Sequence, residues 1–217
     1  MRYIFGNFKM NKSYDEMKDW LKEFKHIYEP SASVTVGVFP QFPFLAKTHD
    51  KLEKLPNVVV GSQTLASDDS GSFTGEVSAQ ALKGVASYVI IGHSERRKYF
   101  SETNEILAKK VECALKQGLT PIYCVRDEHD VIPSGVRFIA YEPVAAIGTG
   151  KNEPPSETVK MKKKIKLPEN AVFIYGGSVN AQNAKEYFAT GEIDGFLIGK
   201  VTLSVAQFLD VVNVAKT

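Results

Sequence analysis

A complete strand–helix–strand unit can be read in residues 88–125, YVIIGHSERRKYFSETNEILAKKVECALKQGLTPIYCV. Its two ends, Tyr88–Ile91 and Thr120–Val125, are short apolar runs typical of strands buried on both faces. Between them, apolar side chains recur at the spacing of one helix face, and Gly118 follows as a C-terminal cap. These apolar positions are Leu107, Val111, Ala114 and Leu115. The order strand, helix, strand predicts two parallel strands joined by a helical crossover.

The same alternation continues on both sides of this unit. Six further apolar runs predict strands near Tyr3–Phe5, Thr35–Phe39, Val58–Val60, Val136–Tyr141, Ala171–Tyr175 and Gly195–Ile198. Helices are expected from Ser13 to about Ile27, over Phe44–Leu55 and Ser78–Lys83, from Ser156 onward, from Asn180 to Gly191, and over Val205–Ala215. Ser13 is expected to form a capping box with Glu16, and Ser156 and Ser204 are each expected to cap the helix that follows. Eight strand–helix units predict an α/β fold of the closed (β/α)8 or TIM-barrel type. No shift in composition marks a boundary, so residues 1–217 are expected to form a single domain.

One unit is too short for this pattern. Only twelve residues separate Cys124 from Arg137, and they include Pro133 and Gly135. An extended loop of this length can span the return distance, but it cannot also hold a full helix. We therefore expect the helix between strands five and six to be missing or reduced to a loop. Seven outer helices would remain, with a bare or thinly covered apolar patch. This patch is a candidate for an extra interface, unless neighbouring segments fold over it.

The composition argues against several classes of protein. The 27 basic and 25 acidic side chains give a net charge of +2, which is too balanced for a nucleic-acid-binding protein. No apolar stretch approaches the roughly 18 residues of a membrane span, and the N-terminus has no signal-peptide pattern. Cys113 and Cys124 are too few and too far apart for a disulfide framework. We expect a cytoplasmic protein with reduced thiols.

Polar residues gather where the predicted strands end, which is where active sites of such barrels lie. They are Asn7 and Lys9 after the first strand, His93 and Glu95 after the fourth, Glu142 after the sixth, and Gly148, Ser178, Gly199 and Lys200 in turns after strands six, seven and eight. Singly, each has an ordinary structural explanation, such as a solvated lysine or a strand-ending glutamate before proline. Together they offer an acid–base pair, a cation and backbone donors for a phosphate. This set predicts proton transfer next to a carbonyl in a small phosphorylated substrate.

Four motifs connect this prediction to a known family. They are Asn7-Phe8-Lys9-Met10-Asn11, Gly92-His93-Ser94-Glu95-Arg96-Arg97, the run from Tyr141-Glu142-Pro143-Val144 to Gly148-Thr149-Gly150, and Tyr175-Gly176-Gly177-Ser178-Val179. In this order they resemble the triosephosphate isomerases over most of the chain. The resemblance implies interconversion of dihydroxyacetone phosphate and D-glyceraldehyde 3-phosphate through an enediolate, in glycolysis and gluconeogenesis. It implies no metal and no organic cofactor.

The resemblance also implies roles for the residues at the predicted rim. Glu142 would move the proton between adjacent carbons, His93 would be a neutral electrophile, and Lys9 would stabilise the enediolate. Asn7 would help to hold the substrate, and Glu95 would support the lysine. Gly148, Ser178, Gly199 and Lys200 would bind the phosphate, with residues 143–151 as a closing lid.

Departures from the family pattern concern the lid and the phosphate turn. Ala145 stands where the family usually has Trp, Asn152 and Glu153 replace Thr and Ala, and Lys200 replaces a second glycine. The loop around Phe73-Thr74-Gly75 resembles one that inserts into a second subunit, which implies a homodimer. Two alternatives remain open. One is a barrel that binds phosphometabolites without catalysis, and the other is an isomerase for a different sugar phosphate.

Overall fold

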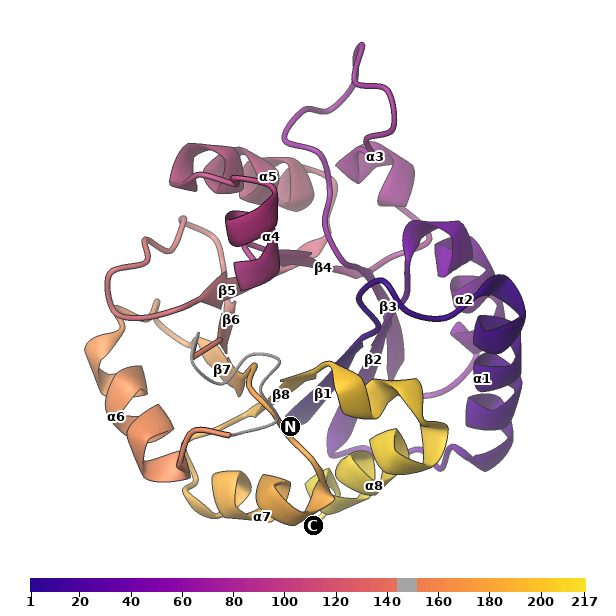
Figure 1. Cartoon of the computed structure of the whole chain (residues 1–217), viewed down its shortest axis with the longest axis vertical. Helices are drawn as coiled ribbons and strands as arrows, with labels where there is room; N and C mark the ends of the chain where they lie inside the picture. The colour runs from indigo at the N-terminus through magenta and orange to yellow at the C-terminus, as the bar shows by residue number, and fades with distance from the viewer. Residues whose placement is uncertain (144–151) are drawn as a thin grey trace.

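Eight parallel strands form a closed barrel in a computed structural model that describes residues 1–143 and 152–217 (Figure 1). The strands are β1 (Arg2–Asn7), β2 (Val34–Phe39), β3 (Val58–Ser62), β4 (Tyr88–Ile91), β5 (Thr120–Val125), β6 (Phe138–Tyr141), β7 (Val172–Tyr175) and β8 (Gly195–Ile198). Each strand pairs with its sequence neighbours, and β8 closes the barrel on β1 through the pairs Tyr3–Gly195 to Gly6–Ile198. The predicted (β/α)8 fold is confirmed.

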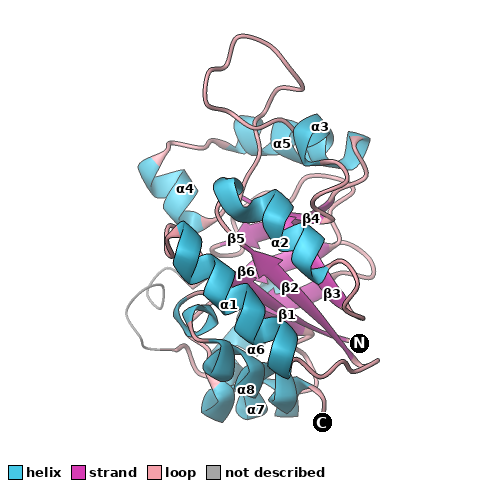
Figure 2. Ribbon diagram, turned by 90° about the vertical axis from the view of Figure 1, so that its right-hand side faces the viewer, coloured by secondary structure: helices cyan, strands magenta, loops and turns pink. Residues whose placement is uncertain are grey.

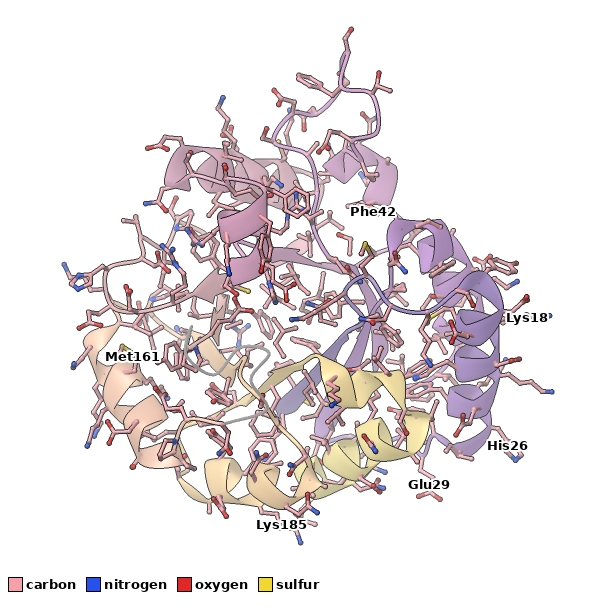
Figure 3. All side chains as sticks on the ribbon, in the orientation of Figure 1. Lys18, His26, Glu29, Phe42, Met161 and Lys185 are labelled. Carbon is pink, nitrogen blue, oxygen red and sulfur yellow. The ribbon has the colours of Figure 1, made fainter. Side chains whose placement is uncertain are left out.

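Helices surround this barrel on the outside (Figure 2). They are α1 (Tyr14–Ile27), α2 (Leu45–Leu52), α3 (Ala79–Leu82), α4 (Ser94–Tyr99), α5 (Asn104–Lys116), α6 (Pro155–Lys164), α7 (Ala181–Ala189) and α8 (Val205–Ala215), with short 3-10 turns η1 (Phe42–Phe44) and η2 (Lys200–Leu203). The described residues thus contain eight α-helices rather than seven, because the β4–β5 connection holds both α4 and α5. Polar side chains such as Lys18 and His26 on α1 and Lys185 on α7 point away from the barrel (Figure 3).

Side-chain caps explain where several helices begin. Ser13 forms a capping box with Glu16 ahead of α1, and Ser204 caps α8, both as predicted. The prediction that Ser156 caps the lysine-rich helix is wrong. Helix α6 begins one residue earlier, at Pro155, because a proline at the first helical position already has the required φ and has no N–H to satisfy.

Large side chains fill the interior of the barrel. Phe5 and Phe39 point inward, and both are fully buried. Glycines make room for them: a Cβ on Gly61 would lie 2.0 Å from the Phe39 ring, and one on Gly37 would lie 2.4 Å from the Phe5 ring. The barrel is therefore a packed core, and a ligand can be held only at one of its mouths.

The β5–β6 connection contains no helix, as predicted (Figure 1). The expected apolar patch over these strands is nevertheless absent from the described surface. The outward-facing side chains of Tyr123, Val125, Ile139 and Tyr141 are all buried. Residues 126–137 fold back over the strands as a loop, which we call the β5–β6 loop, and the Tyr123 hydroxyl donates to its Val131 carbonyl at 3.0 Å. Of the two expected outcomes, the structure shows the second: a neighbouring segment folds over the strands, because a loop with inward apolar side chains can cover two strands without forming a helix.

Candidate active site

His93 and Glu142 form a buried pair at the carboxyl ends of β4 and β6. The imidazole Nε2 lies 3.0 Å from Glu142 Oε1, and the Ser94 backbone N–H donates to Oε2 at 2.8 Å. The Glu142 side chain is 1% exposed. Gly92, at φ +76°, turns the chain between β4 and His93, a conformation that suits glycine. The turn at Gly92 therefore directs the imidazole toward the carboxylate of Glu142, which follows β6 and lies 49 residues further along the chain.

Hydrogen bonding determines the tautomer of the neutral His93 ring. The backbone N–H of Glu95 donates to Nδ1 at 3.2 Å, so Nδ1 is the acceptor and Nε2 carries the proton toward Glu142. Burial disfavours the imidazolium, but the adjacent carboxylate outweighs it, and the pKa of His93 lies above its ordinary value. Burial likewise favours a neutral Glu142, yet the imidazole and Ser94 hold the pKa of this carboxyl below its usual range. Glu142 is therefore ionised at neutral pH.

Lys9 lies opposite this pair in a strained backbone conformation. Its φ is +50°, which is uncommon for a residue with a Cβ, and its N–H donates to Asn7 Oδ1 at 2.9 Å. Its ammonium group lies 2.5 Å from Glu95 Oε1. Asn7 and Glu95 thus fix the lysine at its two ends, and a left-handed residue held in this way is characteristic of functional sites.

Asn7, Lys9 and His93 border a cavity of about 560 Å³ at the mouth of the barrel. Its lining includes Asn7, Lys9, His93, Gly176, Gly177, Ser178, Gly199 and Lys200. Close packing forms its wall: a Cβ on Gly176 would lie 2.9 Å from Glu142 Cγ, and one on Gly199 would lie 3.4 Å from Lys9 Cε. The cavity therefore combines a cation, an imidazole and backbone-rich turns, and its residues come from both ends of the chain.

The structure brings together most, but not all, of the residues predicted for the site. Glu142 does not line the described cavity and contacts it through His93. Gly148 and Ala145 lie outside the described residues. Lys200 lines the cavity but is exposed.

Several residues of this region were missed by the sequence analysis. Asn183 lines the cavity, and its Nδ2 donates to the Ser178 carbonyl at 3.1 Å. This hydrogen bond holds the Gly176-Gly177-Ser178 turn that follows β7. The sequence pointed to Asn183 only indirectly, through the predicted helix start at Asn180, with which Asn183 forms a capping box. Asn152 also lines the cavity. Arg97, described below, was quoted as the last residue of the motif that contains His93 but was given no role of its own.

The Glu153 side chain is held by hydroxyl groups from neighbouring elements. Tyr141 donates to its Oε1 at 3.2 Å, and Thr158 donates to its Oε2 at 3.0 Å. The Glu153 N–H donates to the Tyr175 hydroxyl at 3.0 Å. Its carboxylate and burial raise the pKa of Tyr141 far above the usual range, with burial the larger cause. The glutamate at this position therefore makes contacts that an alanine could not.

Residues 1–143 and 152–217 contain neither a metal-binding cluster nor a membrane-spanning helix. No group of three or more His, Cys, Asp or Glu side chains is arranged to hold a metal ion there. None of the helices in this part of the chain combines the length and the apolar character needed to cross a membrane.

Comparison with known proteins was carried out on the whole chain. The family model of triosephosphate isomerase matches residues 2–137 and 134–215, and the two matches meet in the β5–β6 loop. The chain is 37% identical to the triosephosphate isomerase of Dictyoglomus turgidum over 246 aligned positions, covering 98% of both chains. It is 34% identical to that of Mycoplasmopsis pulmonis, covering 97% of this chain and 96% of the relative, and 33% identical to that of Thermus thermophilus, covering 98% of both. These matches span both halves of the barrel, and the chain belongs to the triosephosphate isomerase family.

Proposed function

We propose that this chain interconverts dihydroxyacetone phosphate and D-glyceraldehyde 3-phosphate, with Glu142 as the general base. The observation that carries the proposal is the His93–Glu142 contact of 3.0 Å beside a cavity that Lys9 lines. A base, a hydrogen-bond donor and a cation around one small cavity are what proton transfer next to a carbonyl needs. We also propose that residues 1–217 act as a single domain in the cytoplasm.

Proton transfer requires Glu142 to leave its contact with His93. In the free protein the carboxylate accepts two hydrogen bonds, from Ser94 N–H and from the imidazole. Substrate oxygens in the cavity would take over the Nε2–H donor, and the carboxylate would turn to the carbon that loses its proton. Removing the carboxylate from Nε2 also removes the interaction that raises the His93 pKa, so the bound imidazole stays neutral and donates.

Lys9 supplies positive charge where the enediolate develops negative charge. The ground-state carbonyl is neutral, so a fixed ammonium group favours the transition state over the substrate. Asn7 and Glu95 hold the lysine in place before substrate binds, which lowers the reorganisation needed at the moment of reaction. Asn7 would in addition help to hold the substrate.

The phosphate would lie at the turns that follow β7 and β8. Ser178, Gly199 and Lys200 line that side of the cavity, and barrels of this type commonly bind phosphate at these two loops. Gly148 would complete the phosphate site from the lid, residues 143–151, most of which lies outside the described residues. The exposed Lys200 side chain would add a positive charge at the rim of the cavity. This charge would attract the doubly negative substrate phosphate without fixing the position of the phosphate.

We further propose a homodimer formed by the loop around Phe73-Thr74-Gly75. This loop, between β3 and α3, projects away from the barrel (Figure 1), and the Phe73 side chain is 49% exposed. A second cavity of about 310 Å³ adjoins Lys9 and Glu95, and exposed Phe100 lines it. A projecting apolar side chain and an apolar-walled cavity on one chain suit reciprocal insertion between two copies. Light scattering is expected to give twice the mass of one chain.

A coupled isomerase assay on the purified protein tests the proposed reaction. Oxidation of NADH by a glycerol phosphate dehydrogenase would report dihydroxyacetone phosphate made from glyceraldehyde 3-phosphate. Binding of a phosphorylated substrate without turnover would instead support the non-catalytic alternative. Faster conversion of a four-, five- or six-carbon sugar phosphate, followed directly by 1H NMR of the sugar, would support the isomerase of different specificity.

A further inference from the structure

The β5–β6 loop contains a buried acidic side chain that the proposed reaction does not use. Asp130 is 4% exposed, and its Oδ2 accepts from the Arg126 backbone N–H at 2.7 Å and from Arg126 Nε at 3.0 Å. Its Oδ1 accepts from Arg126 Nη2 at 2.6 Å. These bonds close the first turn of the loop. A buried carboxylate is costly unless it is paired, so its presence in the shortest crossover of the barrel calls for an explanation.

Asp130 also faces a second arginine, Arg97, which comes from α4. Arg97 Nη1 lies 3.9 Å from Asp130 Oδ1, and the Arg97 side chain is 6% exposed. The same Nη1 donates to Asn104 Oδ1 at 3.1 Å, so Asn104 and the Asp130 charge hold this end of the guanidinium group together. The Tyr123 hydroxyl, which donates to the loop at Val131, accepts from Arg97 Nη2 at 3.3 Å. The guanidinium group is therefore enclosed between β5, α4 and the loop.

Arg97 reaches from this enclosure to the strand ends that carry the site. Its Nε donates to the Gly92 carbonyl at 2.9 Å, and its Nη2 donates to the Cys124 carbonyl at 3.2 Å. Gly92 directly precedes His93, and a Cβ on Gly92 would lie 3.1 Å from Arg97 Nη2. One planar group thus fixes the carboxyl ends of both β4 and β5.

The β5 end is linked in turn to the proposed base. The residue after Cys124 is Val125, whose carbonyl accepts the Glu142 backbone N–H at 2.8 Å. Arg97 therefore bonds to two backbone carbonyls. One belongs to Gly92, the residue before His93, and the other belongs to Cys124, the residue before the Val125 carbonyl that accepts from Glu142. Displacement of the guanidinium group would shift both partners of the 3.0 Å contact between these side chains.

We propose that Asp130 and Arg97 are positioning residues for the isomerase site, through which the short β5–β6 loop fixes His93 relative to Glu142. Asp130 anchors the loop and orients Arg97, and Arg97 sets the Gly92 and Cys124 carbonyls. The loop that stands in place of a barrel helix thus supports the reacting groups as well as covering the strands. This proposal rests on the roles assigned to His93 and Glu142 under the proposed function.

Two substitutions test it against a matched control. Asp130→Asn keeps the shape and removes the charge, and Arg97→Lys keeps the charge but cannot bond to both carbonyls. Glu128→Gln is the control, because it removes a carboxylate of the same loop whose partner, Lys164, lies 3.7 Å away at the surface. Both test variants are expected to lower kcat about 10- to 100-fold with KM within about twofold, since a misplaced reacting group slows the chemical step. The control is expected to keep the kcat and KM of the wild type.

A spectroscopic readout separates positioning from a general structural role. The imidazole 15N shifts of His93, assigned by comparison with His93→Asn, report which ring nitrogen carries the proton. The spectra are recorded at alkaline pH, where the imidazole is neutral despite its raised pKa. The wild type is expected to show the Nε2–H tautomer that the Glu95 N–H enforces, and Asp130→Asn is expected to show a mixture. The double variant should lose little beyond Arg97→Lys, because both residues act along one path.

Several results would overturn the proposal. The first is that both test variants have the kcat and KM of the control. The second is an unchanged His93 spectrum in Asp130→Asn. The third is that neither test variant folds, which would show that Asp130 and Arg97 have a structural role alone. A wild-type protein without isomerase activity would refute the proposed function instead. In that case the His93 spectrum of the ligand-free protein would still decide whether Asp130 positions the ring.

Discussion

Replacing Glu142 with Gln tests the base and its hydrogen bonds together. The carboxylate accepts from two donors, Ser94 N–H at 2.8 Å and His93 Nε2–H at 3.0 Å. A glutamine offers one oxygen, so one of these donors must face an NH2 group, unless the imidazole changes tautomer and gives up its bond from Glu95. A buried donor without a partner costs about 1–3 kcal/mol, so we expect the free energy of unfolding to fall by that amount at pH 8.

Catalysis should suffer more than stability in this variant. A positioned general base contributes ~10²–10⁴ in rate, so kcat of Glu142→Gln should fall by about that factor. Binding of 2-phosphoglycolate, measured by calorimetry, should weaken far less than kcat falls, because the phosphate turns of the cavity do not involve Glu142. Glu142→Asp is the matched comparison: it keeps the charge but draws the oxygens back by one methylene, so it should remain partly active.

The assays for this prediction are coupled isomerisation and urea unfolding monitored by the fluorescence of Trp20. Turnover of Glu142→Gln within about tenfold of the wild type would refute the base assignment, since a base is worth more than that. An unchanged free energy of unfolding would refute the two-donor account of the free protein while leaving the base assignment intact.

Three further predictions concern the same site. Gly176→Ala should lower kcat and destabilise the fold by about 1–3 kcal/mol, because the new Cβ would press on Glu142 Cγ from 2.9 Å; equal kcat and melting temperature would contradict this. Lys9→Met should lower kcat/KM by about 10²–10³ in the coupled assay, yet change the free energy of unfolding by under about 1 kcal/mol, because its partner Glu95 is partly exposed. The stability difference between wild type and Glu142→Gln should depend on pH. The pKa of Glu142 is lowered in the folded protein, so this group stabilises the fold above pH 4.5, and that stability is lost as the pH falls through the folded-state pKa. The pKa of His93 is raised in the folded protein, so this group stabilises the fold below pH 6.5, and that stability is lost as the pH rises through the folded-state pKa. Urea titrations should therefore find the largest difference between about pH 4.5 and 6.5, and a difference that grows toward pH 9 would contradict the pairing.

The barrel was predictable from sequence because its signals are local and repeated. The apolar run Tyr88–Ile91 and the cap at Ser13 each depend on neighbouring residues alone, and both agree with the structure. The missing helix followed from chain length, which no tertiary contact can alter. The covering of β5 and β6 did not follow, because it depends on which side chains of the β5–β6 loop turn inward.

The site was only partly predictable for the same physical reason. His93 and Lys9 were found because strand ends converge at one mouth of a barrel. The contact of Glu142 with His93, in place of a direct position on the cavity, depends on rotamers that the sequence does not encode locally. Asn183 was missed as well, since its helix-capping role and its bond to the Ser178 carbonyl use the same side chain.

The loss of one helix shows which parts of the barrel the chemistry needs. The reacting groups His93 and Glu142 lie at strand ends, and their hydrogen bonds to Ser94 and Glu95 reach only into the first turn of α4. An outer helix contributes burial of apolar strand faces, and any segment with inward apolar side chains can supply the same burial. A helix also satisfies its own backbone, whereas a loop must find partners for each buried polar group. In the β5–β6 loop the buried Asp130 carboxylate meets part of that need, because it accepts the Arg126 backbone N–H and its charge is paired with the half-exposed Arg126 guanidinium group.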